Sequence, residues 1–101
     1  MPNRPWMAAA ALVLAAPWCQ AQDDAAGRSL AATCANCHGT AGVSRGELPS
    51  LAGRAAPELL AAMAEFKSGA RSATIMQQIA KGYTDEQLRL IAGWFAAQPR
   101  P

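Results

Sequence analysis

The run Cys34-Ala35-Asn36-Cys37-His38 constrains this chain more than any other feature of its sequence. It is a C-x-x-C-H motif, the pattern at which c-type haem is attached. Cysteines three positions apart on a helical turn project to the same side, so each sulfur can bond one of the two vinyl groups of a porphyrin. The histidine follows directly and can turn its imidazole onto the iron. The motif therefore predicts one covalent haem c, attached through Cys34 and Cys37, with His38 as an axial ligand of the iron.

Other uses of this motif fit the chain less well. A thioredoxin-like dithiol requires a βαβ context, and the sequence shows none. A structural zinc site needs four ligands, and an iron–sulfur cluster generally needs four cysteines. Once Cys19 has left with the signal segment described below, two cysteines and the single histidine remain. A plain disulfide between Cys34 and Cys37 would leave His38 without a role. Haem attachment is the interpretation that uses all three residues.

The N-terminal segment has the pattern of a secretory signal peptide. A short basic start precedes an apolar run over residues 6–16, and Cys19-Gln20-Ala21 then places small residues two apart. This pattern predicts that residues 1–21 are a cleaved signal peptide and that residues 22–101 form one mature domain in the periplasm. A membrane anchor is disfavoured, because the apolar run is shorter than the roughly 20 residues needed to span a bilayer.

The charge of the chain predicts no strongly electrostatic partner. Lys and Arg number 9 against 7 Asp and Glu, a net charge of +2, which falls to about +1 when Arg4 leaves with the signal. We therefore expect no nucleic-acid partner, and contact with a membrane only through transient redox partners. Lys67, Arg71 and Lys81 could surround an exposed haem edge and face an acidic partner, or they could be ordinary solvated charges. Both interpretations stay open at this point.

The remaining sequence predicts an all-α domain of about four short helices with long loops. No segment shows the alternation of a strand. The last helix has the clearest signals, because Thr84 and Gln87 fit a capping box ahead of an apolar stripe. That stripe consists of Leu88, Ile91, Ala92 and Phe95. Helices are predicted over residues 25–34, 57–67, 75–81 and 84–97, with loops over 39–53 and 69–74. A domain this small closes only a modest core, so we expect the fold to wrap around the haem.

Two methionines compete for the other face of the iron. Met63 lies in an apolar stripe with Leu59, Leu60 and Phe66, where a methionine is more often core packing than ligand. Met76 follows a polar loop that could carry the chain to the other haem face. We favour Met76 as the distal ligand, Met63 is the second candidate, and an iron without a sulfur ligand is the third. Tyr83 either packs on the haem or caps the core.

Over its whole mature length the chain resembles a class I cytochrome c. Gly27, the Cys-x-x-Cys-His-Gly run to Gly39 and the pair Trp94-Phe95 match that family. The resemblance implies that the first and last helices cross near this glycine and these aromatic residues. Because the chain has one C-x-x-C-H only, it resembles no more than one half of a bacterial di-haem cytochrome c.

Three shorter runs resemble the di-haem cytochromes c and, more closely, the cytochrome subunit of flavocytochrome c sulfide dehydrogenase. They are Pro49-Ser50-Leu51-Ala52-Gly53, Phe66-Lys67-Ser68-Gly69 and Ala73-Thr74-Ile75-Met76. In these relatives the methionine matching Met76 is the distal ligand. The proline matching Pro49 lends its carbonyl oxygen to the proximal histidine.

These features predict an electron-transfer protein rather than an enzyme. Histidine and thioether ligation favours ferrous iron and raises the reduction potential. We expect a periplasmic one-electron carrier, whose partners would include a flavoprotein dehydrogenase and a terminal oxidase or another cytochrome. An alternative is the permanent electron-accepting subunit of a flavoprotein dehydrogenase such as sulfide dehydrogenase. A haem sensor or peroxidase with an open distal site is less favoured, because Met76 is available to fill that site.

Overall fold

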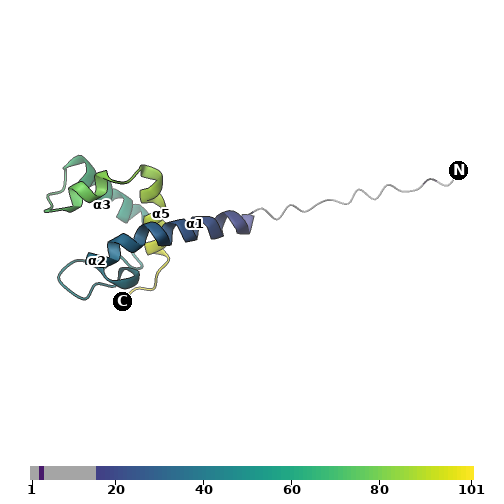
Figure 1. The fold of residues 1–101 in the computed structure, drawn as a ribbon, viewed down its shortest axis with the longest axis horizontal. Coiled ribbons are helices and arrows are strands. Elements are labelled where there is room, and N and C mark those ends of the chain that lie inside the picture. Colours follow the sequence, from purple (N-terminus) through teal and green to yellow (C-terminus); the bar gives the residue numbers. More distant parts are fainter. Residues whose placement is uncertain (1–2, 4–15) are drawn as a thin grey trace.

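The computed structural model describes Asn3 and residues 16–101, and most of the apolar run of the predicted signal peptide lies outside these residues. The described residues are helical and contain no strand, which confirms the all-α prediction (Figure 1). In this part of the chain no helix has the length and apolar character needed to cross a membrane. The elements in order are α1 (Ala16–Ala31), η1 (Ala32–Cys34), α2 (Ala35–His38), η2 (Thr40–Gly42), α3 (Ala56–Ser68), α4 (Met76–Lys81) and α5 (Asp85–Ala96).

Helices α1 and α5 pack across each other at the centre of the domain (Figure 1). Gly27 is buried at the crossing, where a Cβ atom would lie 2.7 Å from the carbonyl oxygen of Leu90 and 3.2 Å from Cβ of Trp94. The first of these distances involves main chain that cannot rotate away, so a side chain at position 27 would push the helices apart. Glycine therefore sets the distance between α1 and α5, and the crossing implied by the resemblance is confirmed.

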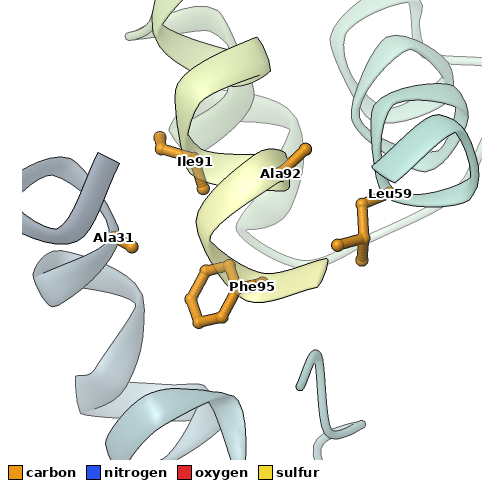
Figure 2. Packing of buried hydrophobic residues seen from close by; sticks show 5 residues of the cluster. All are labelled: Ala31, Leu59, Ile91, Ala92 and Phe95. Carbon is orange, nitrogen blue, oxygen red and sulfur yellow. The ribbon is translucent and has the colours of Figure 1, made fainter. Parts of the chain in front are cut away.

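The core is small and lies where three helices meet (Figure 2). Phe95 is 2% exposed, and its ring meets that of Trp94 edge to face with 5.2 Å between centroids. Around Phe95, the buried cluster contains Ala31 from α1, Leu59 from α3, and Ile91 and Ala92 from α5. The stripe predicted on α5 is confirmed, since all of its members are buried. On α3 only Leu59 is buried, and Leu60, Met63 and Phe66 are half-buried.

The helix predicted over residues 25–34 was wrong at both ends. α1 begins at Ala16 and ends at Ala31, where it gives way to the 3-10 turn η1. Pro17 lies in the first turn of α1, where a proline removes no helical hydrogen bond. At the other end the Thr33 hydroxyl donates to the Leu30 carbonyl oxygen at 3.0 Å, a local bond that competes with continued helix. The chain thus tightens into a 3-10 turn just before the C-x-x-C-H motif.

The three later helices match their predictions to within about two residues, the usual uncertainty of helix ends. The capping box of α5 is confirmed by both of its hydrogen bonds. The Gln87 amide donates to Thr84 Oγ1 at 3.1 Å, and the Thr84 amide donates to Gln87 Oε1 at 2.9 Å. Local sequence signals therefore placed these helices correctly.

Candidate haem-attachment site

The two motif cysteines lie on consecutive short turns and carry free thiols. Cys34 is half-buried at the end of η1, and Cys37 is exposed within α2. Burial raises the pKa of the Cys34 thiol above that of a free cysteine; a hydrogen bond with Thr33 opposes the rise and the nearby Cys37 adds to it. Redox-active dithiols work through a lowered thiol pKa, and the shift at Cys34 is in the opposite direction.

His38, the last residue of α2, is buried with 9% of its surface exposed. Its Nδ1 atom lies 2.8 Å from the carbonyl oxygen of Pro49. A carbonyl oxygen can only accept a hydrogen bond, so Nδ1 carries the proton and donates it. The unprotonated nitrogen is then Nε2, the atom that a metal ligand must present. A histidine held by its second ring nitrogen is the usual arrangement at protein metal centres.

The loop that carries Pro49 is closed at its base by hydrogen bonds. The Leu51 amide donates to the Gly42 carbonyl at 2.8 Å, and the Ser44 amide donates to Ser50 Oγ at 2.9 Å. Gly39, directly after His38, has a φ of +87°, and a Cβ there would collide with the Val43 carbonyl oxygen. The chain therefore needs glycine at position 39 to turn sharply and bring the Pro49 carbonyl back onto the histidine.

The donor set of the described residues fits a haem and no other metal centre. They contain no group of three or more His, Cys, Asp or Glu that could hold a metal ion. The two cysteines and the histidine of the C-x-x-C-H motif lie within the short consecutive turns η1 and α2. A zinc site would need further ligands close by. The residues present thus match covalent haem attachment with one protein nitrogen on the iron.

The two candidate distal ligands both come from the neighbouring helices α3 and α4, which pack together. Met76 is the first residue of α4, and Met63 lies in the middle of α3. Both side chains are half-buried, so exposure does not separate them. Their positions differ, because Met76 follows the irregular segment after α3 whereas Met63 sits within a continuous helix. The choice between them remains a prediction.

Two of the three basic residues considered from the sequence make specific internal contacts. Lys67 Nζ donates to the Tyr83 carbonyl oxygen at 2.9 Å and lies 3.5 Å from an Asp85 carboxylate oxygen. Arg71 pairs with Glu65 at 2.7 Å. Lys81 is exposed at the end of α4. The sequence suggested either a ring of charges around a haem edge or ordinary solvated charges. It did not predict these internal contacts of Lys67 and Arg71, because their partners are not apparent from local spacing.

The contact of Tyr83 was also missed. Its hydroxyl lies 2.7 Å from Oγ1 of Thr33, the residue before Cys34, although the two are 50 positions apart in the chain. Tyr83 also packs against the core cluster, which agrees with the prediction that it caps the core. Nothing in the local sequence around Thr33 or Tyr83 indicates that the two residues meet.

The comparison with protein families agrees with this geometry, since residues 25–96 match the model of cytochrome c. The chain belongs to the cytochrome c family. It therefore carries a covalent c-type haem and is an electron-transfer protein, not itself an enzyme. The matched segment begins after the predicted signal peptide and includes the C-x-x-C-H motif.

Three curated relatives show which cytochromes this chain is similar to. It is 44% identical over 69 residues to the cytochrome subunit of sulfide dehydrogenase of Chlorobaculum tepidum, covering 68% of this chain and 63% of the relative. It is 39% identical over 79 residues to cytochrome c4 of Pseudomonas aeruginosa, and the match covers 77% of this chain and 39% of that relative. It is 34% identical over 82 residues to cytochrome c-554(548) of Halomonas halodenitrificans, and the match covers 77% of this chain and 99% of that relative. The chain thus spans less than two thirds of the first two relatives and nearly all of the third. The resemblance seen in the sequence is confirmed.

Proposed function

We propose that this cytochrome c is a periplasmic one-electron carrier whose haem is attached through Cys34 and Cys37 and ligated by His38 and Met76. The observation that carries the proposal is the hydrogen bond from His38 Nδ1 to the Pro49 carbonyl. It leaves Nε2 as the ligating atom and fixes the orientation of the ring. A bound haem supplies a one-electron ferric–ferrous couple, and histidine with thioether ligation raises its potential.

The role of the residues in this chain is to hold the haem and orient its ligands; they carry out no reaction themselves. Thioether bonds at Cys34 and Cys37 would make haem retention covalent rather than an equilibrium. His38 is held by main chain and so need not move when the iron changes oxidation state. Small structural change on electron transfer suits a carrier that meets its partners through short-lived, small interfaces.

The distal ligand is tested by a pair of substitutions. Met76→Ala should abolish the weak near-infrared absorption of ferric haem bound to thioether sulfur, lower the reduction potential, and open the iron to cyanide. The reason is that a ligand favouring ferrous iron is lost. Met63→Leu conserves volume on a half-buried helix face, so it should cost less than about 1.5 kcal/mol and leave the spectrum unchanged.

Each other outcome of this pair has a definite meaning. Loss of the sulfur band in Met63→Leu together with its survival in Met76→Ala would reverse the assignment. A wild-type protein without the band would refute methionine ligation and favour the sensor or peroxidase with an open distal site. The two variants together distinguish an iron ligand from a packing residue, which neither variant can do alone.

Export and processing are a separate part of the proposal. Residues 20–25 are all exposed, so the chain around a cleavage site after Ala21 is accessible in the structure. The intact mass of protein from the periplasm should equal residues 22–101 plus one haem that resists acid–acetone extraction. A mass that retains residues 1–21 would contradict cleavage, and extractable haem would contradict covalent attachment.

The alternative is a permanent subunit of a flavoprotein dehydrogenase such as sulfide dehydrogenase. It is supported by the relative named as the cytochrome subunit of sulfide dehydrogenase, whereas the name of the relative cytochrome c-554(548) designates no subunit. Native purification from the periplasm distinguishes them. A haem protein that elutes as a monomer supports the carrier, and stoichiometric co-elution with a flavoprotein supports the subunit.

A further inference from the structure

One side-chain hydrogen bond joins two segments that are far apart in the chain. The Tyr83 hydroxyl lies 2.7 Å from Thr33 Oγ1. Thr33 directly precedes Cys34 on the haem-attachment turn, and Tyr83 lies just after α4, whose first residue is Met76. The contact, here called the Tyr83–Thr33 latch, therefore links the segment with the proposed distal ligand to the turn with the first attachment cysteine.

The direction of this hydrogen bond follows from the other contact of Thr33. The Thr33 hydroxyl donates its proton to the Leu30 carbonyl oxygen at 3.0 Å. A hydroxyl has one proton but can accept as well, so at the latch Tyr83 is the donor and Thr33 the acceptor. Replacing the phenol by a phenyl ring therefore removes the latch while keeping the ring that packs against the core.

Tyr83 is held by its main chain as well. Its amide donates to the Ala80 carbonyl in the last turn of α4 at 3.3 Å, and its carbonyl accepts from Lys67 Nζ of α3 at 2.9 Å. The main chain of Tyr83 is therefore hydrogen-bonded both to the end of α4 and to α3. Tyr83 lies at a junction where α3, α4 and the attachment turn are tied together by polar contacts.

Little else holds α4 against the attachment turn. The helix has six residues, of which only Ala80 is buried, and it packs on α3. Neither α1 nor α2 is among the elements that α4 packs closely against in the described structure. A short helix with one buried residue opens at low free-energy cost unless other contacts restrain it.

We propose that Tyr83 is a positioning residue for Met76. The Tyr83–Thr33 latch holds α4 at a fixed distance from the haem-attachment turn and so opposes displacement of the methionine sulfur from the iron. The inference rests on the proposed ligation by Met76. It adds a role for a residue outside the proposed attachment residues and iron ligands.

The test uses the full haem-loaded protein and three variants, Tyr83→Phe, Thr33→Val and the double substitution. In the ferric proteins, imidazole competes with the sulfur ligand, and its affinity reports how easily that ligand leaves. Loss of one hydrogen bond should strengthen imidazole binding about three- to tenfold in each single variant. Thr33→Val also removes the bond from Thr33 to the Leu30 carbonyl, so the double variant should change no more than Thr33→Val alone, because the Tyr83–Thr33 bond is already absent there.

A second measurement reports the latch without reference to the iron. Amide hydrogen exchange at Ile79 and Gly82, which donate to the carbonyls of Ile75 and Ile79, should speed up about three- to tenfold in Tyr83→Phe. Amides in the middle of α5 should exchange at the wild-type rate. This contrast distinguishes local opening of α4 from loss of global stability.

Gln98→Met is the matched control. Gln98 Nε2 donates to the Trp94 carbonyl at 2.9 Å at the far end of α5, so this variant also loses one side-chain hydrogen bond. It should leave both imidazole affinity and α4 exchange unchanged. Equal effects in Gln98→Met and Tyr83→Phe would overturn the proposal, because they would show a general response to lost stability.

The remaining outcomes are equally decisive. Unchanged α4 exchange in Tyr83→Phe would show that the latch restrains nothing. Faster exchange with unchanged imidazole affinity would make Tyr83 a structural residue only and would also overturn the proposal. A sulfur band that survives Met76→Ala would instead refute the ligand assignment, and α4 exchange would still decide whether the latch exists.

Discussion

The region that carries His38 and the region that carries Met76 are held in different ways. In the first, residues 25–53 pack with α5, His38 is buried, and its ring is bound by main chain. In the second, residues 56–83, the methionine is half-buried at the start of a six-residue helix. This second region meets the rest of the domain through Leu59 of α3 in the core, through the pair of Lys67 with Asp85, and through the contact of Tyr83 with Thr33.

This difference indicates that the two proposed axial ligands are fixed to different degrees by the fold. A buried ring with one nitrogen committed to a carbonyl has one orientation available. A thioether on a short helix with one buried residue has more freedom, so its position depends on a few hydrogen bonds. We therefore expect ligand exchange at the iron to occur on the methionine side.

The largest expected effect comes from removing the haem attachment that both regions share. Cys34→Ala combined with Cys37→Ala should give a chain without covalent haem that is largely unfolded. The buried hydrophobic residues include Ala31, Ala52, Ala80 and Ala92, which bury little area each, so the described core is weak by itself. Far-ultraviolet circular dichroism should lose most of its helical signal, and Trp94 fluorescence should rise. A helical, cooperatively melting chain would contradict this expectation.

A smaller effect should follow from a substitution confined to the His38 side. Gly27→Ala places a methyl group against the Leu90 carbonyl and should cost about 2 kcal/mol in chemical denaturation, as overpacked cores do. The near-infrared sulfur band should persist in the folded variant, because the crossing of α1 and α5 does not hold the methionine.

Gly93→Ala is the control for this substitution. Gly93 is exposed on α5, and a Cβ there would have nothing within 4 Å. Alanine should stabilise the helix by about 0.5–1 kcal/mol. Equal destabilisation by both substitutions would mean that the α1–α5 distance does not depend on the glycine at position 27.

The smallest expected effect concerns a polar contact on the Met76 side. Lys67→Met keeps the apolar stem but removes the donor to the Tyr83 carbonyl, so ferric imidazole affinity should rise by about threefold with little change in the denaturation midpoint. Arg89→Met is matched to it, because it also removes a basic group, one that pairs with exposed Glu86 on the same helix. Arg89→Met should change neither quantity. Identical behaviour of the two variants would remove Lys67 from the set of contacts that restrain α4.

Much of the fold was predictable because its signals are local. The capping box at Thr84 and Gln87, the apolar stripe of α5 and the absence of strand alternation depend on residues within a few positions of one another. The C-x-x-C-H motif is local for the same reason, and it predicted the cofactor of the family. The start of α1 at Ala16 was missed because residues 16–21 were assigned to the end of a signal peptide and not to a helix.

The contacts that shape the site depend on tertiary structure. Pro49 and His38 are 11 positions apart, and their bond was expected only from the resemblance, since no local pattern pairs a proline carbonyl with an imidazole. The contact of Tyr83 with Thr33 spans 50 positions and had no sequence signal. The sequence by itself determined which atoms can hold a haem. Only the tertiary structure brought the Pro49 carbonyl to His38 and the Tyr83 hydroxyl to Thr33, because such pairs form only when segments separated in the chain meet.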